Sequence, residues 1–204
     1  MSVHKLGFVA LLLTALSSAA VQAQSGGPPA ATSGSSAGPS AAVGSSGPPA
    51  EPAEYKTTDY RSPVPATLSG ARVVTPGEAK ALYDSRAVLI DVYPRPPKPP
   101  ELPAGTVWRD PKHASIAGTH WLPNVGYGVL APAASEYLAT RLATLSGGDR
   151  SKTLVFFGLT DCWMSWNAAK RALSLGYTSV VWFPDGTDGW QALGWPLTEV
   201  EPVP

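Results

Sequence analysis

The sequence between about residues 70 and 200 predicts an α/β fold, in which helices cover both faces of a mainly parallel central sheet. Three observations support this prediction. The apolar runs "AVLIDV" (87–92), "TLVFFG" (153–158) and "SVVWF" (179–183) are typical of buried parallel strands. Segments with helical spacing of apolar residues alternate with these runs. A long proline-rich insertion separates the first run from the rest.

The first strand and helix are predicted within "ARVVTPGEAKALYD". A short strand at 73–74 leads to Thr75, which has the features of an N-cap. Pro76 follows at the first helical position and Glu78 at the third, as in a capping box, so we expect a helix through residue 84. The strand at 87–92 then ends near Asp91, at the carboxyl edge where open α/β sheets bind their ligands.

The insertion after this strand reads "YPRPPKPPELPAGTVWRDPKHASIAG". Proline at this density favours extended polyproline II conformation and cannot take part fully in a sheet. Since the strands on both sides are clear, we interpret the segment as a functional insertion loop. The short strand "HWLPN" (120–124) follows it.

The second half continues the alternation of helices and strands. Leu138, Leu142 and Leu145 recur at helical spacing in the predicted helix 131–145, and "SGG" provides its stop. A helix over 165–177 and a turn with a short helix over 185–197 complete the chain. The predicted order is β-α-β-(loop)-β-α-β-α-β-α.

The N-terminal quarter of the chain predicts export. Residues 1–23 have a charged start, an apolar core too short to span a bilayer and small residues at the cleavage position, as in a secretion signal. The alternative is a retained membrane anchor. Residues 24–54 are rich in Ala, Gly, Ser and Pro and are typical of a disordered linker. Residues 55–69 form an extension, and residues 70–200 form one domain.

Charge and cysteine content exclude several classes of function. The formal net charge is zero, so neither nucleic-acid binding nor an attraction to anionic membranes is indicated. We expect no membrane contact after cleavage of the signal. The only cysteine is Cys162, which excludes an internal disulfide. An unpaired cysteine in an exported protein is buried, reactive or used between chains.

Several motifs resemble a known family. "LIDV", "HASIAGTHWLPN", "LVFFG" and "GTDGWQALGWPL" resemble a single rhodanese domain over about residues 70–200. More narrowly, "RPPKPP", "TVWRDP", "WLPNVGYG" and "CWMSWNAAKRA" resemble an exported branch that is associated with pyrroloquinoline quinone (PQQ)-dependent alcohol catabolism and is known by a C-x-x-x-C-W motif. This resemblance implies a rhodanese-like fold and a periplasmic location. It also implies PQQ or a related quinone as a cofactor by association, and as partner a PQQ-dependent dehydrogenase, its cytochrome or a periplasmic binding protein.

The resemblance implies an active-site loop after the strand that ends at residue 157. Backbone N–H groups at such a strand-to-helix turn can form an anion-binding hollow that favours a thiolate. Rhodaneses carry sulfur there as a persulfide on a cysteine that directly follows the strand. In this chain that position is Gly158. Any covalent chemistry must therefore use Cys162, which occupies the second cysteine position of the C-x-x-x-C-W motif. The expected loop consists of Gly158, Leu159, Thr160, Asp161, Cys162, Trp163, Met164 and Ser165.

Two arguments from the residues limit this chemistry. Asp161 places a negative charge beside Cys162, which disfavours a thiolate. A structural alternative is a small apolar cysteine packed under Trp163 and Trp166. Phosphatase chemistry is excluded, because the arginine required six residues after the nucleophile is absent: those positions are Ala168 and Met164.

Other candidates are expected around the rim of this hollow. His120 is a hypothetical base for Cys162, while Asp91 is more typical of a structural acid. Trp108, Trp121 and Trp163 have the shape to stack a planar quinone or a partner peptide, although core packing explains tryptophan equally well. No metal site is predicted, because His113, His120 and Cys162 do not have the short spacing in sequence that is typical of metal ligands. The complete rim set is Asp91, Arg95, Trp108, Arg109, His120 and Trp121.

Three functional hypotheses remain open from the sequence. The first is a ligand- or partner-binding module with a degenerate active-site loop. The second is a sulfurtransferase or thiol-redox enzyme that uses Cys162 as its only nucleophile. The third is a thiol that links the protein to another protein or a cofactor.

Overall fold

In the computed structural model, residues 47–204 are described. The predicted secretion signal and most of the predicted linker lie outside this range. No helix among residues 47–204 is long and apolar enough to cross a membrane.

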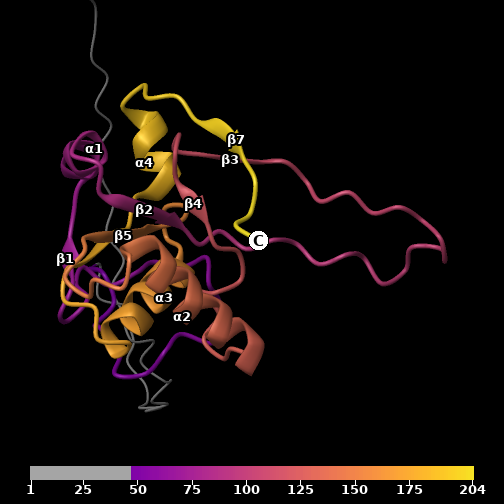
Figure 1. Cartoon of the computed structure of the whole chain (residues 1–204), viewed down its shortest axis with the longest axis horizontal. Helices are drawn as coiled ribbons and strands as arrows, with labels where there is room; N and C mark the ends of the chain where they lie inside the picture. Colours follow the sequence, from indigo (N-terminus) through magenta and orange to yellow (C-terminus); the bar gives the residue numbers. More distant parts are fainter. Residues whose placement is uncertain (1–46) are drawn as a thin grey trace, which may run out of the picture. The chain divides into compact units, whose positions relative to one another are not determined.

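The core of the molecule is a five-stranded, wholly parallel sheet with the strand order β1-β6-β5-β2-β4 (Figure 1). The strands are β1 (Arg72–Val73), β2 (Val88–Asp91), β4 (His120–Trp121), β5 (Leu154–Phe157) and β6 (Val180–Phe183). All residues of β5 and β6 are buried, as their unbroken apolar sequence predicts. In the register of the central pair, Asp91 lies opposite Phe157.

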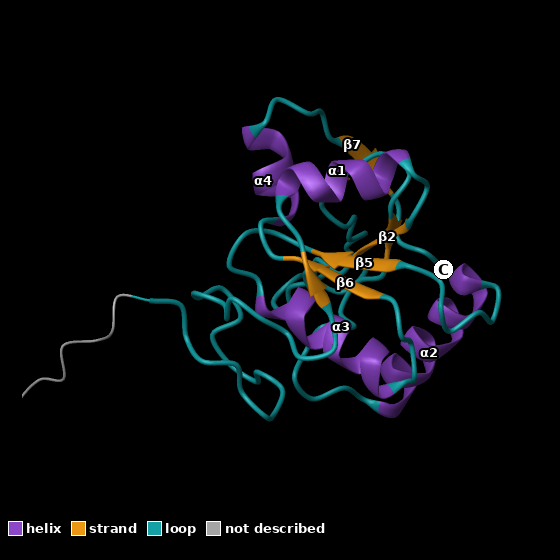
Figure 2. Ribbon diagram, turned by 90° about the vertical axis from the view of Figure 1, so that its left-hand side faces the viewer, coloured by secondary structure: helices purple, strands orange, loops and turns teal. Residues whose placement is uncertain are grey.

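Four helices cover the two faces of this sheet. In Figure 2, α1 (Pro76–Asp84) and α4 (Gly186–Ala192) lie on one face, and α2 (Pro132–Ser146) and α3 (Trp163–Ser174) lie on the other. The two hydrophobic clusters follow this division, since α2 and α3 pack over the larger one, whereas α1 and α4 pack over the smaller. The predicted fold class is therefore confirmed as α/β with a mainly parallel sheet.

Local signals place the helix ends close to the predicted residues. At the start of α1, Thr75 and Glu78 form the expected capping box behind Pro76. At the end of α2, Gly147 takes a left-handed conformation with a φ of 65°.

One small sheet was not expected from the sequence. The strand β3 (His113–Ser115) pairs antiparallel with β7 (Thr198–Val200), close to the C-terminus. Each strand has only three residues, which is too short for a recognisable alternation of apolar and polar side chains. This pairing anchors the far end of the insertion loop, residues 93–112, which projects from the body of the domain in Figure 1.

The N-terminal extension is also ordered. Residues 51–69, called the strap below, run along α3. The side chain of Asn167 accepts a hydrogen bond from the backbone N–H of Lys56 at 3.0 Å and donates to its carbonyl at 2.8 Å. The strap begins inside the segment assigned to the linker, because the Glu51 carboxylate accepts hydrogen bonds from the Thr67 hydroxyl and the Ser69 N–H, both at 2.8 Å.

Candidate functional site

The only cysteine lies at the start of α3 and faces the residue that follows β5. Cys162 is 3% exposed. A Cβ built on Gly158 would lie 3.2 Å from the Cys162 Sγ and 3.6 Å from its Cβ. The two positions of the C-x-x-x-C-W motif are therefore neighbours in space, as the sequence reading implied.

Three backbone N–H groups of the loop, those of Thr160, Trp163 and Ser165, are bonded within the protein. The Thr160 N–H donates to the Asp188 carboxylate at 3.0 Å. The Trp163 N–H donates to the Tyr60 carbonyl of the strap at 3.0 Å, and the Ser165 N–H to the Cys162 carbonyl at 3.2 Å. The expected hollow of converging amides is thus not formed by these three groups, because protein oxygens already occupy them.

Negative charges surround the same loop. Asp161 is exposed and adopts a left-handed conformation with a φ of 54°. The Thr160 hydroxyl donates to the Asp185 carbonyl at 2.8 Å, so the side chain of Asp185 belongs to the same surface. Burial, and then the charge of Asp161, raise the pKa of Asp185 above its usual value. A further anion would meet these carboxylates and Asp188, which disfavours anion binding here.

The strap closes over the cysteine from the other side. Arg61 forms an isolated antiparallel bridge with Cys162. The indole N–H of Trp163 donates to the Ser62 hydroxyl at 3.0 Å and to the Pro63 carbonyl at 3.1 Å. Trp163 therefore serves the packing of the strap, in agreement with the core-packing alternative.

A pocket of about 420 Å³ lies between the strap and the base of the insertion loop, and Cys162 contributes to its wall. Tyr60 and Tyr127 meet edge to face in it, with ring centroids 5.4 Å apart. Its lining is Tyr60, Arg61, Tyr93, Pro94, Tyr127, Leu159, Cys162 and Met164.

Two further pockets share residues with this one and continue along the insertion loop. The second, about 360 Å³, shares Tyr93, Pro94 and Tyr127 with the first, and the third, about 430 Å³, shares Tyr127 with both. We call the three together the aromatic groove. Beyond the first pocket it is lined by Arg95, Pro96, Pro97, Lys98, Trp108, Asp110, Pro111, Lys112, His113, Trp121 and Asn124.

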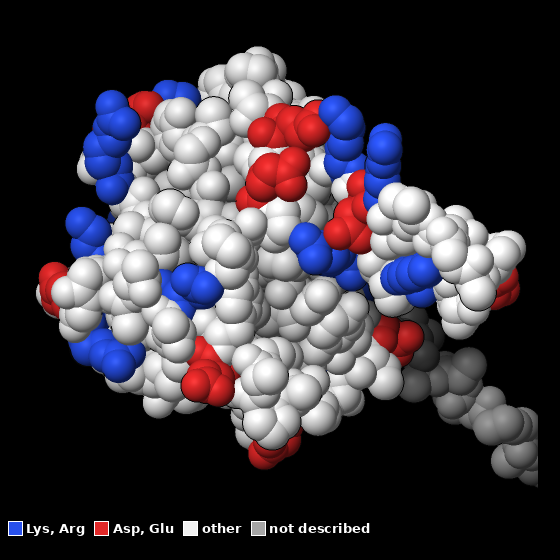
Figure 3. All heavy atoms as spheres, turned by 45° about the vertical axis from the view of Figure 1, so that its right-hand side comes forward, with Lys and Arg blue, Asp and Glu red and all other residues white. Residues whose placement is uncertain are grey.

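Two of the four Lys and Arg side chains that line the aromatic groove are paired with acids. Arg95 lies 3.0 Å from Asp110, and Lys112 lies 2.7 Å from Glu199, whose hydrogen bond and charge raise the pKa of Lys112. Figure 3, which brings the side of the insertion loop forward, shows basic and acidic groups interleaved. Within residues 47–204, neither Arg61 nor Lys98 makes an ion pair. Arg61 is the unpaired cation of the first pocket, whereas Lys98 lies in the third and donates to the Thr106 carbonyl at 3.3 Å.

Asp91 holds the groove floor together. Its carboxylate is fully buried and accepts hydrogen bonds from the Tyr93 N–H at 2.8 Å and the Ser115 hydroxyl at 2.5 Å. His113 Nε2 lies 2.7 Å from the same carboxylate, and the imidazole stacks on Tyr93 with centroids 4.9 Å apart. The structural role expected for Asp91 fits these contacts.

The predicted rim residues divide into three groups. Arg95, Trp108 and Trp121 line the aromatic groove, but the indole N–H of Trp121 is already bonded to the Tyr93 carbonyl at 2.7 Å. Arg109 lines none of its pockets. His120 lines a separate pocket at the opposite edge of the sheet, where the short β4 begins, so it does not face Cys162 as a base.

Sequence reasoning missed part of the groove. Tyr60 and Arg61 come from the strap, which carries no recognisable motif. Tyr93 and Tyr127 lie within the quoted "YPRPP" and "VGYG", but nothing in these segments indicated that they line the same pockets. Among residues 47–204, no group of three or more His, Cys, Asp or Glu side chains is arranged to hold a metal ion.

Comparisons with known proteins gave similar structures only. No family model and no curated protein matches this chain. A rhodanese-like domain from Anabaena sp. is 17% identical with a TM-score of 0.41 over 65% of this chain and 81% of that one. A protein of unknown function from Rhodopseudomonas palustris, described as a possible tyrosine phosphatase, is 20% identical with a TM-score of 0.41 over 64% and 86%. A polysulfide-sulfur transferase from Wolinella succinogenes is 20% identical with a TM-score of 0.40 over 64% and 80%.

Gly158→Cys is expected to form a disulfide with Cys162. The Cβ separation of 3.6 Å lies within the range of about 3.5–4.5 Å seen in disulfides, and Gly158 does not have the positive φ that would exclude a cysteine. After mild oxidation, thiol titration of the unfolded protein should find no free thiol. Gly77→Cys, on open surface of α1, is the matched control and should keep both thiols. Two free thiols in the Gly158 variant would contradict the loop geometry.

Asp91→Asn is expected to lower the free energy of unfolding by about 3 kcal/mol, because one amide oxygen cannot accept from all three partners of the buried carboxylate. Urea unfolding measures this. Asp84→Asn is the control: it removes an exposed i,i+4 pair with Lys80 and should change stability by about 0.5 kcal/mol or less. Equal effects of the two substitutions would show that Asp91 does not hold the groove floor.

Proposed function

We propose that this chain is an exported, periplasmic rhodanese-like accessory protein of PQQ-dependent alcohol catabolism, which binds a ligand or partner instead of transferring sulfur. The sequence motifs that resemble the C-x-x-x-C-W branch support the biological context. The parallel sheet and the strand-to-helix loop of the chain agree with the expected domain type.

The main support for a binding role comes from the burial and hydrogen bonding of the loop after β5. Sulfur transfer needs an accessible nucleophile in an anion-binding hollow. Here Gly158 provides no sulfur, Cys162 is 3% exposed beneath the strap, and the Thr160 N–H is bonded to a carboxylate. The loop therefore supports the structure around the aromatic groove and lacks the features of a sulfur carrier.

The groove chemistry suits a planar anion. Tyr60, Tyr93 and Tyr127 offer aromatic faces and edges on which a flat ring system can pack. The guanidinium of Arg61 can form two parallel hydrogen bonds with a carboxylate. PQQ, a flat quinone that carries carboxylates, has this combination, and so we propose PQQ or a related quinone as the ligand. A PQQ-dependent dehydrogenase, its cytochrome or a periplasmic binding protein is the proposed partner.

A second candidate function rests on one specific contact. Cys162 contributes to the wall of the first pocket, so a thiol substrate that enters the groove could reach the sulfur once the strap moves. This is the alternative of a sulfurtransferase or thiol-redox enzyme with a single nucleophile.

Alkylation distinguishes the two functions. We expect iodoacetamide to modify Cys162 at least about 100-fold more slowly in the native protein than in urea, because the strap excludes the reagent. Asn167→Ala, which releases Lys56 of the strap, should speed the native reaction, whereas Thr144→Ala on α2 should not. Rapid native alkylation, together with thiosulfate sulfurtransferase activity that is lost in Cys162→Ala, would establish the enzyme instead.

Ligand binding tests the proposed role directly. We expect PQQ to quench tryptophan fluorescence saturably, and titration calorimetry to give the same affinity. Arg61→Ala should weaken binding about tenfold, or about 1.4 kcal/mol, through the loss of a charge-assisted hydrogen bond. Arg109→Ala, which removes the same charge outside the groove, should leave the affinity unchanged. An equal loss in both variants would indicate non-specific attraction of the anion.

A further inference from the structure

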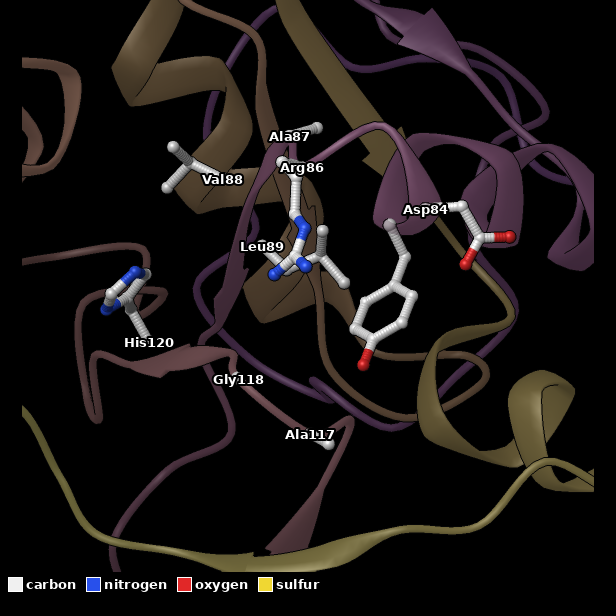
Figure 4. Close-up of a pocket in the computed structure, with 9 residues that line it drawn as sticks. Asp84, Arg86, Ala87, Val88, Leu89, Ala117, Gly118 and His120 are labelled. Atoms are coloured by element: carbon white, nitrogen blue, oxygen red, sulfur yellow. The ribbon is translucent and has the colours of Figure 1, made fainter.

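A separate pocket of about 450 Å³ lies at the amino edge of the sheet, opposite the edge that carries Cys162. It is formed where α1 ends, β2 begins and the turn before β4 closes the third side (Figure 4). Its lining is Tyr83, Asp84, Arg86, Ala87, Val88, Leu89, Ala117, Gly118 and His120. None of these residues belongs to the aromatic groove.

Arg86 occupies a position where the backbone favours glycine. The Arg86 N–H donates to the Tyr83 carbonyl and the Ala87 N–H to the Leu82 carbonyl, both at 3.0 Å, which is the Schellman pattern at a helix end. Arg86 is the left-handed residue of this motif, with a φ of 63°. An arginine is strained there, because a residue with a Cβ disfavours the left-handed conformation.

The guanidinium of Arg86 makes no ion pair with Asp84, the acid in the pocket lining. In Figure 4 it points from the end of α1 toward the space between Gly118 and His120, while the Asp84 carboxylate points away from it. Lys80 holds both Asp84 oxygens at 2.7 Å. Within residues 47–204, Arg86 makes no side-chain hydrogen bond or ion pair, and its charge is available to a ligand.

The rest of the lining decides which anion fits. Val88, Leu89 and Ala117 add apolar surface to a lining that is otherwise largely polar. Burial lowers the pKa of His120, which disfavours a second positive charge there and leaves a hydrogen-bonding group. One cation beside a small apolar surface matches a ligand with one negative charge and an apolar body. A phosphate dianion would lack a second cation and would leave the apolar surface unused.

We propose that this pocket is a second ligand site, which binds a small organic monocarboxylate through the Arg86 guanidinium. The carboxylate lies against Arg86 and the Gly118 turn, and the apolar body lies against Leu89 and Ala117. The site is independent of the function proposed for the aromatic groove, since the two lie at opposite edges of the sheet.

Benzoate is a suitable probe, with benzamide as its neutral analogue and inorganic phosphate as a small anion without an apolar body. In ¹⁵N-labelled protein we expect benzoate to shift the Gly118 amide signal saturably, with a dissociation constant of about 1 mM, as for weak single-cation sites. Benzamide and phosphate should bind at least about fivefold more weakly.

Arg86→Gly is the decisive variant, because glycine relieves the backbone strain and removes the cation together. Benzoate affinity should fall about tenfold while the midpoint of thermal unfolding rises by about 1–4 °C. Arg109→Gly removes the same charge on the insertion loop and should leave benzoate binding unchanged. Unaltered benzoate binding in Arg86→Gly, benzamide binding equal to that of benzoate, or shifts confined to the aromatic groove would each overturn the proposal.

Discussion

The partners of the N–H groups after β5 determine what this molecule can do. Buried or partly buried backbone donors must find an acceptor, and in this loop the acceptors are an Asp188 carboxylate oxygen and the Tyr60 carbonyl. With these bonds formed, Cys162 is turned toward Gly158. A sulfur-bound anion that used the N–H groups of Thr160 or Trp163 would have to displace acceptors that the protein itself supplies. The space that remains usable lies on the other side of the cysteine, between the strap and the insertion loop.

The tryptophans of α3 explain why the strap stays in place. A buried indole needs an acceptor for its N–H group. Trp163 donates to Ser62 and Pro63, and the Trp166 indole donates to the Thr67 carbonyl at 3.1 Å. The apolar bodies of the two rings join the larger core, while their polar edges bind the strap. The strap is therefore part of the folded domain, and its Tyr60 and Arg61 become walls of the aromatic groove.

The sequence predicted the features that depend on local pattern. Buried strands such as 153–158, the capping box at Thr75 and the glycine stop at Gly147 all follow from residues close together in the chain. The proximity of Gly158 and Cys162 also follows, because a single tight turn joins the strand to the helix.

Features that depend on distant contacts could not be predicted in this way. His113 lies beside Asp91 because β3 pairs with β7. This pairing spans more than half of the folded domain, and strands of three residues give no recognisable sequence pattern from which to predict it. His120, the first residue of the predicted strand 120–124, lines the pocket at the amino edge because β4 is short and begins there. Asp188 reaches the loop only through the packing of α4, so its bond to the Thr160 N–H was not visible in the sequence.

The contact between Gly158 and Cys162 explains, without catalysis, why a cysteine suits position 162. A Cβ at position 158 would meet the sulfur at 3.2 Å, so the thiol already occupies most of the space that the missing side chain leaves. Cores disfavour both voids and overpacking, and a small residue opposite a sulfur satisfies this balance. In the exported protein proposed above, an exposed thiol would form mixed disulfides in an oxidising compartment. Burial under the strap prevents this, and the same strap that protects the sulfur provides Tyr60 and Arg61, which line the aromatic groove.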